Sequence, residues 1–227
     1  MGGNMDKTLK KDFFLPVIIP ENLLKDPQAC QINAIKTVLH NLTKKEVDIE
    51  VIKRKFHFDE DGALNEPYHF QDFNNYLNQN KIHFRTNKGH FNDITDVFCL
   101  LKQNIPVPIF FGSEIIKLIM DMLKMKYEPN LGEQIFECNT KHVLVLVGYN
   151  KNGEELLFFD PVYQLPYLQT NKKTSKSDAL VLNWKDAFQH YKQYKSHIHF
   201  RIDRYREKKF KNEIVPEESK EKQITLE

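Results

Sequence analysis

Two short apolar runs in the second half of the chain predict a β-hairpin. The first run follows His142, the second ends at Asp160, and the turn residues of 150–153 separate them. Runs of Val, Leu and Phe this short, bounded by turn residues, are typical of buried strands. A three-residue loop at 151–153, with its glycine in the left-handed region, would place Leu144 opposite Asp160.

That register would bring His142 and Asp160 to the same face of the sheet. As diagonal neighbours they would lie roughly 7–8 Å apart, within reach of long side chains. A two-residue Asn-Gly turn would instead shift the register by one residue and separate the two side chains on opposite faces. The sequence also allows a plainer interpretation, in which His142 is an ordinary strand-end histidine and Asp160 opens an Asp-Pro turn.

A helix with an apolar stripe is predicted in the first third of the chain. Asp26 can cap this helix, Pro27 suits its first position, and Cys30 then lies within its first turn. The unpaired backbone N–H groups and the helix dipole favour a negative charge there, which makes Cys30 a candidate nucleophile. The alternative is an inert core cysteine, because cysteine is among the most buried residue types.

The remaining periodicity predicts a single α+β domain over residues 13–204. Thr43 and Glu46 form a candidate capping box at the start of a helix that runs to Phe56. Further helices are predicted at 66–80, 93–103, 113–126 and 183–194, and further strands at 82–85, 105–112, 180–182 and 198–202. Residues 1–12 and 205–227 are polar and charged, which predicts disorder.

Composition narrows the classes of function. The chain has 227 residues, and its net charge of +2 gives no reason to expect a nucleic-acid partner. Its three cysteines, Cys30, Cys99 and Cys138, offer no disulfide framework and suit a reducing, cytoplasmic compartment. No CxxC or HExxH motif is present, so we expect neither a metal nor another cofactor. The apolar runs are too short to span a membrane.

Cysteine catalysis needs a thiolate, a base and a group that orients the base, and Cys30, His142 and Asp160 come in that order. Over about residues 17–202 the chain resembles papain-like cysteine peptidases, most closely the bacteriocin-processing, double-glycine-leader peptidase domains. The matching features are the proline-flanked run 104–109, the strand from His142 to Tyr149, the pair Asp160-Pro161, and a late helix with Trp184 and Phe188. The resemblance implies a papain-like fold, in which the helix of the nucleophile packs on an antiparallel sheet.

The resemblance is weakest around the cysteine. Gln31 stands where the family commonly has glycine, and Leu24 stands where it has an oxyanion-hole glutamine. We therefore expect Gln28 or Asn22 to supply the oxyanion donor. A missing donor costs about 10²–10³ in rate in enzymes where it has been removed.

The sequence thus predicts a cysteine hydrolase, a peptidase or isopeptidase, that acts on a protein or peptide through a thioester. The implied roles are nucleophile for Cys30, base for His142 and orienter of the base for Asp160. A transglutaminase-like or acyl-transfer enzyme would use the same order of residues. A catalytically inactive papain-fold binding module is the third interpretation.

The charged segment 205–227 is similar to the acidic tails of effectors that bacterial type IV systems export. Its acidic residues include Glu217, Glu218 and Glu221. That similarity implies secretion into a host cell, where ubiquitin-like or other host proteins that end in Gly-Gly would be candidate substrates. A plain solvated tail explains the same composition.

Overall fold

The computed structural model describes residues 12–26, 29–57, 68–82, 84–89, 94–128, 141–191 and 197–202. The two segments predicted to be disordered lie outside these ranges except for Asp12, which is exposed and accepts a hydrogen bond from Lys176 Nζ at 2.9 Å. Within the described ranges, no helix is both long and apolar enough to cross a membrane.

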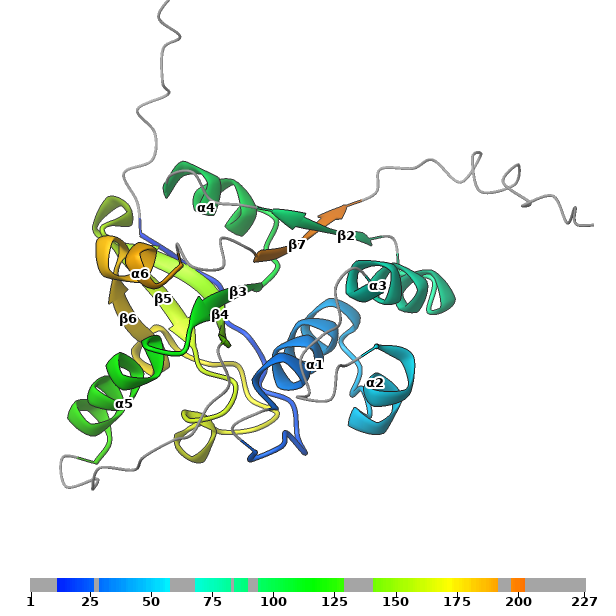
Figure 1. Ribbon diagram of the computed structural model, residues 1–227, viewed down its shortest axis with the longest axis horizontal. Helices are drawn as coiled ribbons and strands as arrows, with labels where there is room; N and C mark the ends of the chain where they lie inside the picture. The colour runs from blue at the N-terminus through cyan, green and yellow to red at the C-terminus, as the bar shows by residue number, and fades with distance from the viewer. Residues whose placement is uncertain are drawn as a thin grey trace, which may run out of the picture.

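An antiparallel sheet runs through the centre of the molecule (Figure 1). Its strands are β1 (Phe13–Phe14), β2 (Phe84–Gly89), β3 (Val107–Gly112), β4 (Lys141–Asn150), β5 (Glu155–Phe159), β6 (Leu180–Asn183) and β7 (His197–Ile202). The spatial order is β2-β7-β3-β4-β5-β6, and β1 pairs with β4 off this path. Each pairing between described strands is antiparallel. The most apolar strand, β4, therefore lies between β3 and β5 in the middle of the sheet.

Helices cover this sheet from several directions. They are α1 (Cys30–Thr43), α2 (Ile49–Lys55), α3 (Tyr68–Gln79), α4 (Ile94–Leu101), α5 (Ile115–Lys126) and α6 (Trp184–Tyr191). In Figure 1, α1, α2 and α3 lie on one side of the central strands, and α5 and α6 lie on the other. Contacts join α1 to β4 and β3, and join α6 to β3 and β6. The predicted α+β class, with the helix of Cys30 packed on an antiparallel sheet, is confirmed.

Helix α1 is the central helix of the fold. Every residue from Cys30 to His40 is buried, because α1 lies between the sheet and the pair α2 and α3. Cys30 belongs to the core against the sheet, whereas Ile35 belongs to a second core with α2 and α3. Even Lys36 is buried, and its charge is compensated by Glu46 at 2.6 Å. Buried charges are tolerated only when they are paired in this way.

The predicted start of α1 is wrong by one turn. The helix begins at Cys30, with Ala29 as its N-cap residue and no side-chain hydrogen bond to the cap. The backbone N–H of Ala29 donates to the carbonyl of Asp26 at 2.9 Å, so Asp26 belongs to a turn that precedes the helix. Pro27 lies outside the described residues. The correction makes Cys30 the first helical residue, beside the N–H groups that the helix leaves unpaired.

The predicted capping box of the second helix is also wrong. Thr43 is the last residue of α1, and α2 begins only at Ile49. The side chain of Asp48 caps α2 instead, by accepting a hydrogen bond from the second N–H of the helix at 2.9 Å. Glu46 is drawn away from a capping role because it pairs with the buried Lys36.

The hairpin of β4 and β5 differs from the predicted one at its turn. Asn150 pairs with Glu155 rather than with Glu154, because the connection is one residue longer than predicted. A β-bulge between Leu146 and Gly148 then shifts the register by one residue. A bulge inserts one extra residue into one of two paired strands.

The bulge restores the predicted alignment at the far end of the hairpin. Val145 pairs with Phe159 beyond it, so the next pair in register is Leu144 with Asp160. His142, two residues from Leu144, therefore shares a face with Asp160. Without the bulge, Val145 would stand opposite Asp160, and the His142 side chain would lie on the other face of the sheet.

Gly148, at the end of the bulge, lies directly under β1. A Cβ atom at this position would lie 2.3 Å from the carbonyl oxygen of Phe13 and 3.0 Å from Cα of Phe14. Both are backbone atoms, so they cannot move aside as the end of a side chain could. Glycine is therefore required for β1 to pair with β4.

We expect Gly148→Ala to lower the free energy of unfolding by about 1–3 kcal/mol, the usual cost of overpacking. Urea unfolding followed by circular dichroism measures the change. Val181→Ala, at a strand position that is 43% exposed, is the control and should change stability by less than about 0.5 kcal/mol. An unchanged unfolding midpoint for Gly148→Ala would show that β1 does not pack as described.

Candidate active site

The structure brings together the three residues that the sequence singles out. Cys30 opens α1, His142 is the second residue of β4, and Asp160 directly follows β5. His142 Nε2 and Asp160 Oδ2 lie 2.7 Å apart, and the exposed fractions of the two side chains are only 1% and 0%. This is the length of a charge-assisted hydrogen bond shielded from water.

The side chain of Cys30 lies next to the same imidazole ring. The Cys30 side chain is within hydrogen-bonding reach of His142, and it too is buried, with 5% of the residue exposed. Because Asp160 occupies Nε2, the ring nitrogen left for the sulfur is Nδ1. A protonated imidazole can donate from both nitrogens at once. The ring thus stands between a sulfur and a carboxylate.

This environment sets the charge of the ring. Burial alone would lower the pKa of His142, but the negative charge and hydrogen bond of Asp160 oppose it, as does the Cys30 sulfur. Together they raise the pKa of His142 from 6.5 to about 10. The ring therefore carries a positive charge at neutral pH.

The carboxylate of Asp160 is held by more than the histidine. Its second oxygen, Oδ1, accepts the backbone N–H groups of Val162 and Tyr163, each at 2.7 Å. Its own backbone N–H donates to the Gln164 side chain at 3.1 Å. Gln164 is fully buried and donates in turn to the carbonyl of Asp178. The carboxylate is thus fixed in the orientation that it presents to His142.

Asn33, one turn after Cys30 in α1, joins three parts of the site. Its side chain is fully buried, and Nδ2 donates to the carbonyls of Pro161 at 2.9 Å and Leu24 at 2.8 Å. Its Oδ1 accepts the N–H of Leu24 at 3.0 Å. Asn33 therefore ties the helix of Cys30 to the residue after Asp160. It also fixes the backbone of Leu24.

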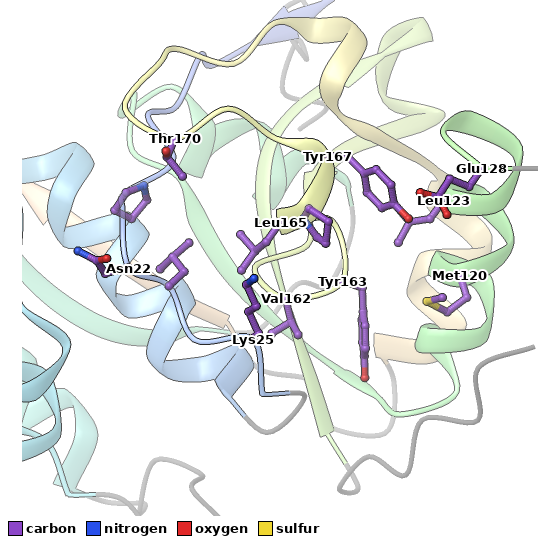
Figure 2. A pocket seen from close by; sticks show the side chains of 13 residues that line it. Asn22, Lys25, Met120, Leu123, Glu128, Val162, Tyr163, Leu165, Tyr167 and Thr170 are labelled. Carbon is purple, nitrogen blue, oxygen red and sulfur yellow. The ribbon is translucent and has the colours of Figure 1, made fainter. Parts of the chain in front are cut away.

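A pocket of about 720 Å³ lies beside these residues (Figure 2). Tyr163 connects the two, because its ring lines the pocket and lies 5.5 Å from the ring of His142 between centroids, tilted by 37°. The cavity is within the range of roughly 300–1,000 Å³ that is typical of ligand sites.

Of the two candidate oxyanion donors, the structure describes only Asn22. Gln28 lies outside the described residues. Asn22 is exposed, has a left-handed backbone with φ of 53°, and lines the pocket. In Figure 2 it lies across the pocket from Tyr163, the residue that contacts His142. The donor role of either residue stays a prediction.

Three residues of the site were missed by the sequence analysis: Asn33, Tyr163 and Gln164. Asn33 carried little signal of its own beyond its position three residues after the candidate nucleophile, since the same helix also contains polar residues such as Gln31 and Lys36. The segment of Tyr163 and Gln164 has the composition of an ordinary polar loop. Its role depends on a turn around Asp160 that composition does not reveal.

The raised pKa of His142 predicts a specific pH dependence of stability. Because the folded chain holds the proton up to about pH 10 and the ordinary pKa is 6.5, the stabilisation is complete below pH 6.5. It is lost as the pH rises from there toward 10. We expect the difference in unfolding free energy between the wild type and His142→Gln to be largest near pH 6 and to shrink toward pH 10. A difference that stays constant over this range would contradict the charged ring.

Comparisons with known proteins agree with this fold. The model of the Peptidase_C39 like family matches residues 17–194. None of the curated proteins matches the chain. A crystal structure from Bacillus anthracis, described as that of a C39-like peptidase, superposes with a TM-score of 0.51 at 15% identity, over 84% of this chain and 98% of the other. That likeness concerns the fold, whereas the family match covers most of the sequence.

The order of elements, the antiparallel sheet and the family match lead to one assignment. The chain belongs to the Peptidase_C39-like family, and it is a cysteine peptidase-like hydrolase of the papain-like class.

Proposed function

We propose that the protein hydrolyses amide bonds in a protein or peptide, with Cys30 as nucleophile, His142 as acid and base, and Asp160 as the group that orients His142. The observation that carries the proposal is the buried ring of His142, bonded to Asp160 at 2.7 Å and within reach of the Cys30 sulfur. A nucleophile, a base and an orienting acceptor in contact are the requirement for this chemistry.

In the proposed first step, the Cys30 thiolate attacks the carbonyl carbon of the substrate. The positive ring of His142 favours the thiolate, as does the position of Cys30 at the start of α1. When the tetrahedral intermediate collapses, the carbon–nitrogen bond breaks and His142 gives its proton to the leaving amine. The acyl group remains on the sulfur as a thioester, and His142 is left neutral.

The second step uses the neutral ring as a base. His142 takes a proton from water, the resulting hydroxide attacks the thioester carbon, and the acid and the Cys30 thiolate are released. Acylation removes the negative charge of the sulfur, which is one of the influences that raise the pKa of His142. The ring therefore gives up its proton more readily at the stage where a base is needed. Asp160, held by the N–H groups of Val162 and Tyr163 and by the Gln164 side chain, keeps the ring in place through both steps.

Alkylation by iodoacetamide tests the proposed nucleophile without a known substrate. We expect Cys30 to be alkylated at pH 6 at least tenfold faster than the exposed Cys99, because only Cys30 has the His142 ring and a helix start beside its sulfur. Peptide mass spectrometry over time measures both rates in one sample. We expect His142→Ala to remove the difference and Cys30→Ala to abolish cleavage of a proteome-derived peptide library. Slow alkylation of Cys30 in the wild type would favour the inactive binding module, and full activity of Cys30→Ala would exclude the proposed nucleophile.

Transfer of the acyl group to an amine remains distinguishable from hydrolysis. The thioester accepts either water or an amine, so the products decide between a hydrolase and a transglutaminase-like enzyme. We expect free carboxylates at the new ends of library peptides, even with added amine.

We further propose that the substrate is a host protein and that the chain is an exported effector. The support is the polar, highly charged composition of 205–227, with Glu217, Glu218 and Glu221 close together, in a segment outside the described residues. We expect a reporter fused to residues 205–227 to be translocated by a bacterium with a type IV system, and a fusion in which Glu217, Glu218 and Glu221 are changed to Gln to be translocated less. Equal translocation of both fusions would exclude the acidic residues as the signal.

A further inference from the structure

We propose that the pocket beside His142 binds apolar side chains of the part of the substrate that leaves with the amine. The claim that the pocket takes the leaving side of the substrate rests on the proposed function, whereas the pocket itself is described by the structure. It assigns to the enzyme a preference for apolar residues just after the scissile bond.

The interior of the pocket is apolar. Met120 and Leu123 of α5 form one wall, and Val162 and Leu165 of the loop after Asp160 form another (Figure 2). Burying apolar side chains is favourable by roughly 25 cal/mol per Å² of apolar surface. The charged residues Lys25 and Glu128 also line the pocket, and Lys25 is exposed.

The walls of the pocket are fixed rather than loose. The ring of Tyr167 stacks on Tyr127 with centroids 4.4 Å apart and planes 2° apart. Tyr127 in turn donates to the carbonyl of Asp178 at 3.2 Å, and Gln164 bonds both Tyr127 and Asp178. A site held in this way loses little entropy when a ligand binds.

The proposed reaction determines which side of the scissile bond lies next to the pocket. His142 gives its proton to the leaving amine, so the leaving segment must pass on the His142 side of the Cys30 sulfur. Tyr163 forms a wall of the pocket and also contacts the ring of His142. The loop that continues from Asp160 through Tyr163 to Leu165 therefore links proton transfer to the pocket. A side chain soon after the scissile bond is the part of a peptide that can reach it.

Binding of small amine peptides tests the pocket independently of catalysis. The probes are the dipeptide amides Leu-Leu-NH₂ and Gly-Gly-NH₂, which have the same charge and differ in apolar side chains. With methyl-labelled methionine, we expect Leu-Leu-NH₂ to shift the Met120 methyl resonance saturably, with at least tenfold higher affinity than Gly-Gly-NH₂. We expect Leu165→Asn to weaken Leu-Leu-NH₂ at least fivefold and Leu168→Asn, three residues further along the same loop, to leave it unchanged. Leu165→Ala serves if Leu165→Asn does not fold.

Equal affinity for the two amides, or a Met120 resonance that does not respond to Leu-Leu-NH₂, would overturn the proposal.

Cleavage of a proteome-derived peptide library then tests which side of the scissile bond the pocket binds. We expect Leu, Ile, Met and Phe to be enriched at the first residues after the scissile bond, and Leu165→Asn to lose that enrichment while the alkylation rate of Cys30 is retained. Enrichment only before the bond would overturn the direction. A wild type that binds Leu-Leu-NH₂ but cleaves no peptide would contradict the proposed function and leave the pocket standing.

Discussion

The register between β4 and β5 is the constraint on which the rest of the site depends. A strand has only two faces, so a shift of one residue would send the His142 side chain away from Asp160. The longer turn at 151–154 introduces such a shift, and the bulge between Leu146 and Gly148 cancels it. Gly148 lets β1 pass over the same point. The geometry of the candidate active site is therefore set several residues away from it, in the middle of a buried strand.

Burial strengthens the interaction between His142 and Asp160, and it also requires that both buried charges be compensated. Removing a charged partner from a buried pair typically costs about 3–5 kcal/mol, because the remaining charge is left without compensation. Asp160 meets this demand through the N–H groups of Val162 and Tyr163, and its turn is closed by Gln164. The same turn carries on into the wall of the pocket. The contacts that stabilise the loop are thus the contacts that orient the candidate acid and base and shape the neighbouring cavity.

The sequence was informative where local rules decide the structure and misleading where long-range contacts do. The strands and most of the helices could be predicted from periodicity, whereas the shared face of His142 and Asp160 was inferred from an assumed turn. The shared face was predicted correctly, although the predicted turn was one residue short and the bulge was not foreseen. The capping box at Thr43 failed because Glu46 pairs with Lys36, a partner that only the folded chain brings near. Asn33 and Gln164 were missed for the same reason, since their partners lie far away in space or depend on one particular turn.

The fold would influence the proposed reaction mainly through the charge that it gives to the His142 ring. Nitrogen-15 NMR of the imidazole ring at pH 8 measures it directly, in the wild type and in Asp160→Asn. The account predicts a ring protonated on both nitrogens in the wild type and on one in the variant, because the Asp160 charge and hydrogen bond outweigh burial. A neutral ring in the wild type at pH 8 would contradict the account.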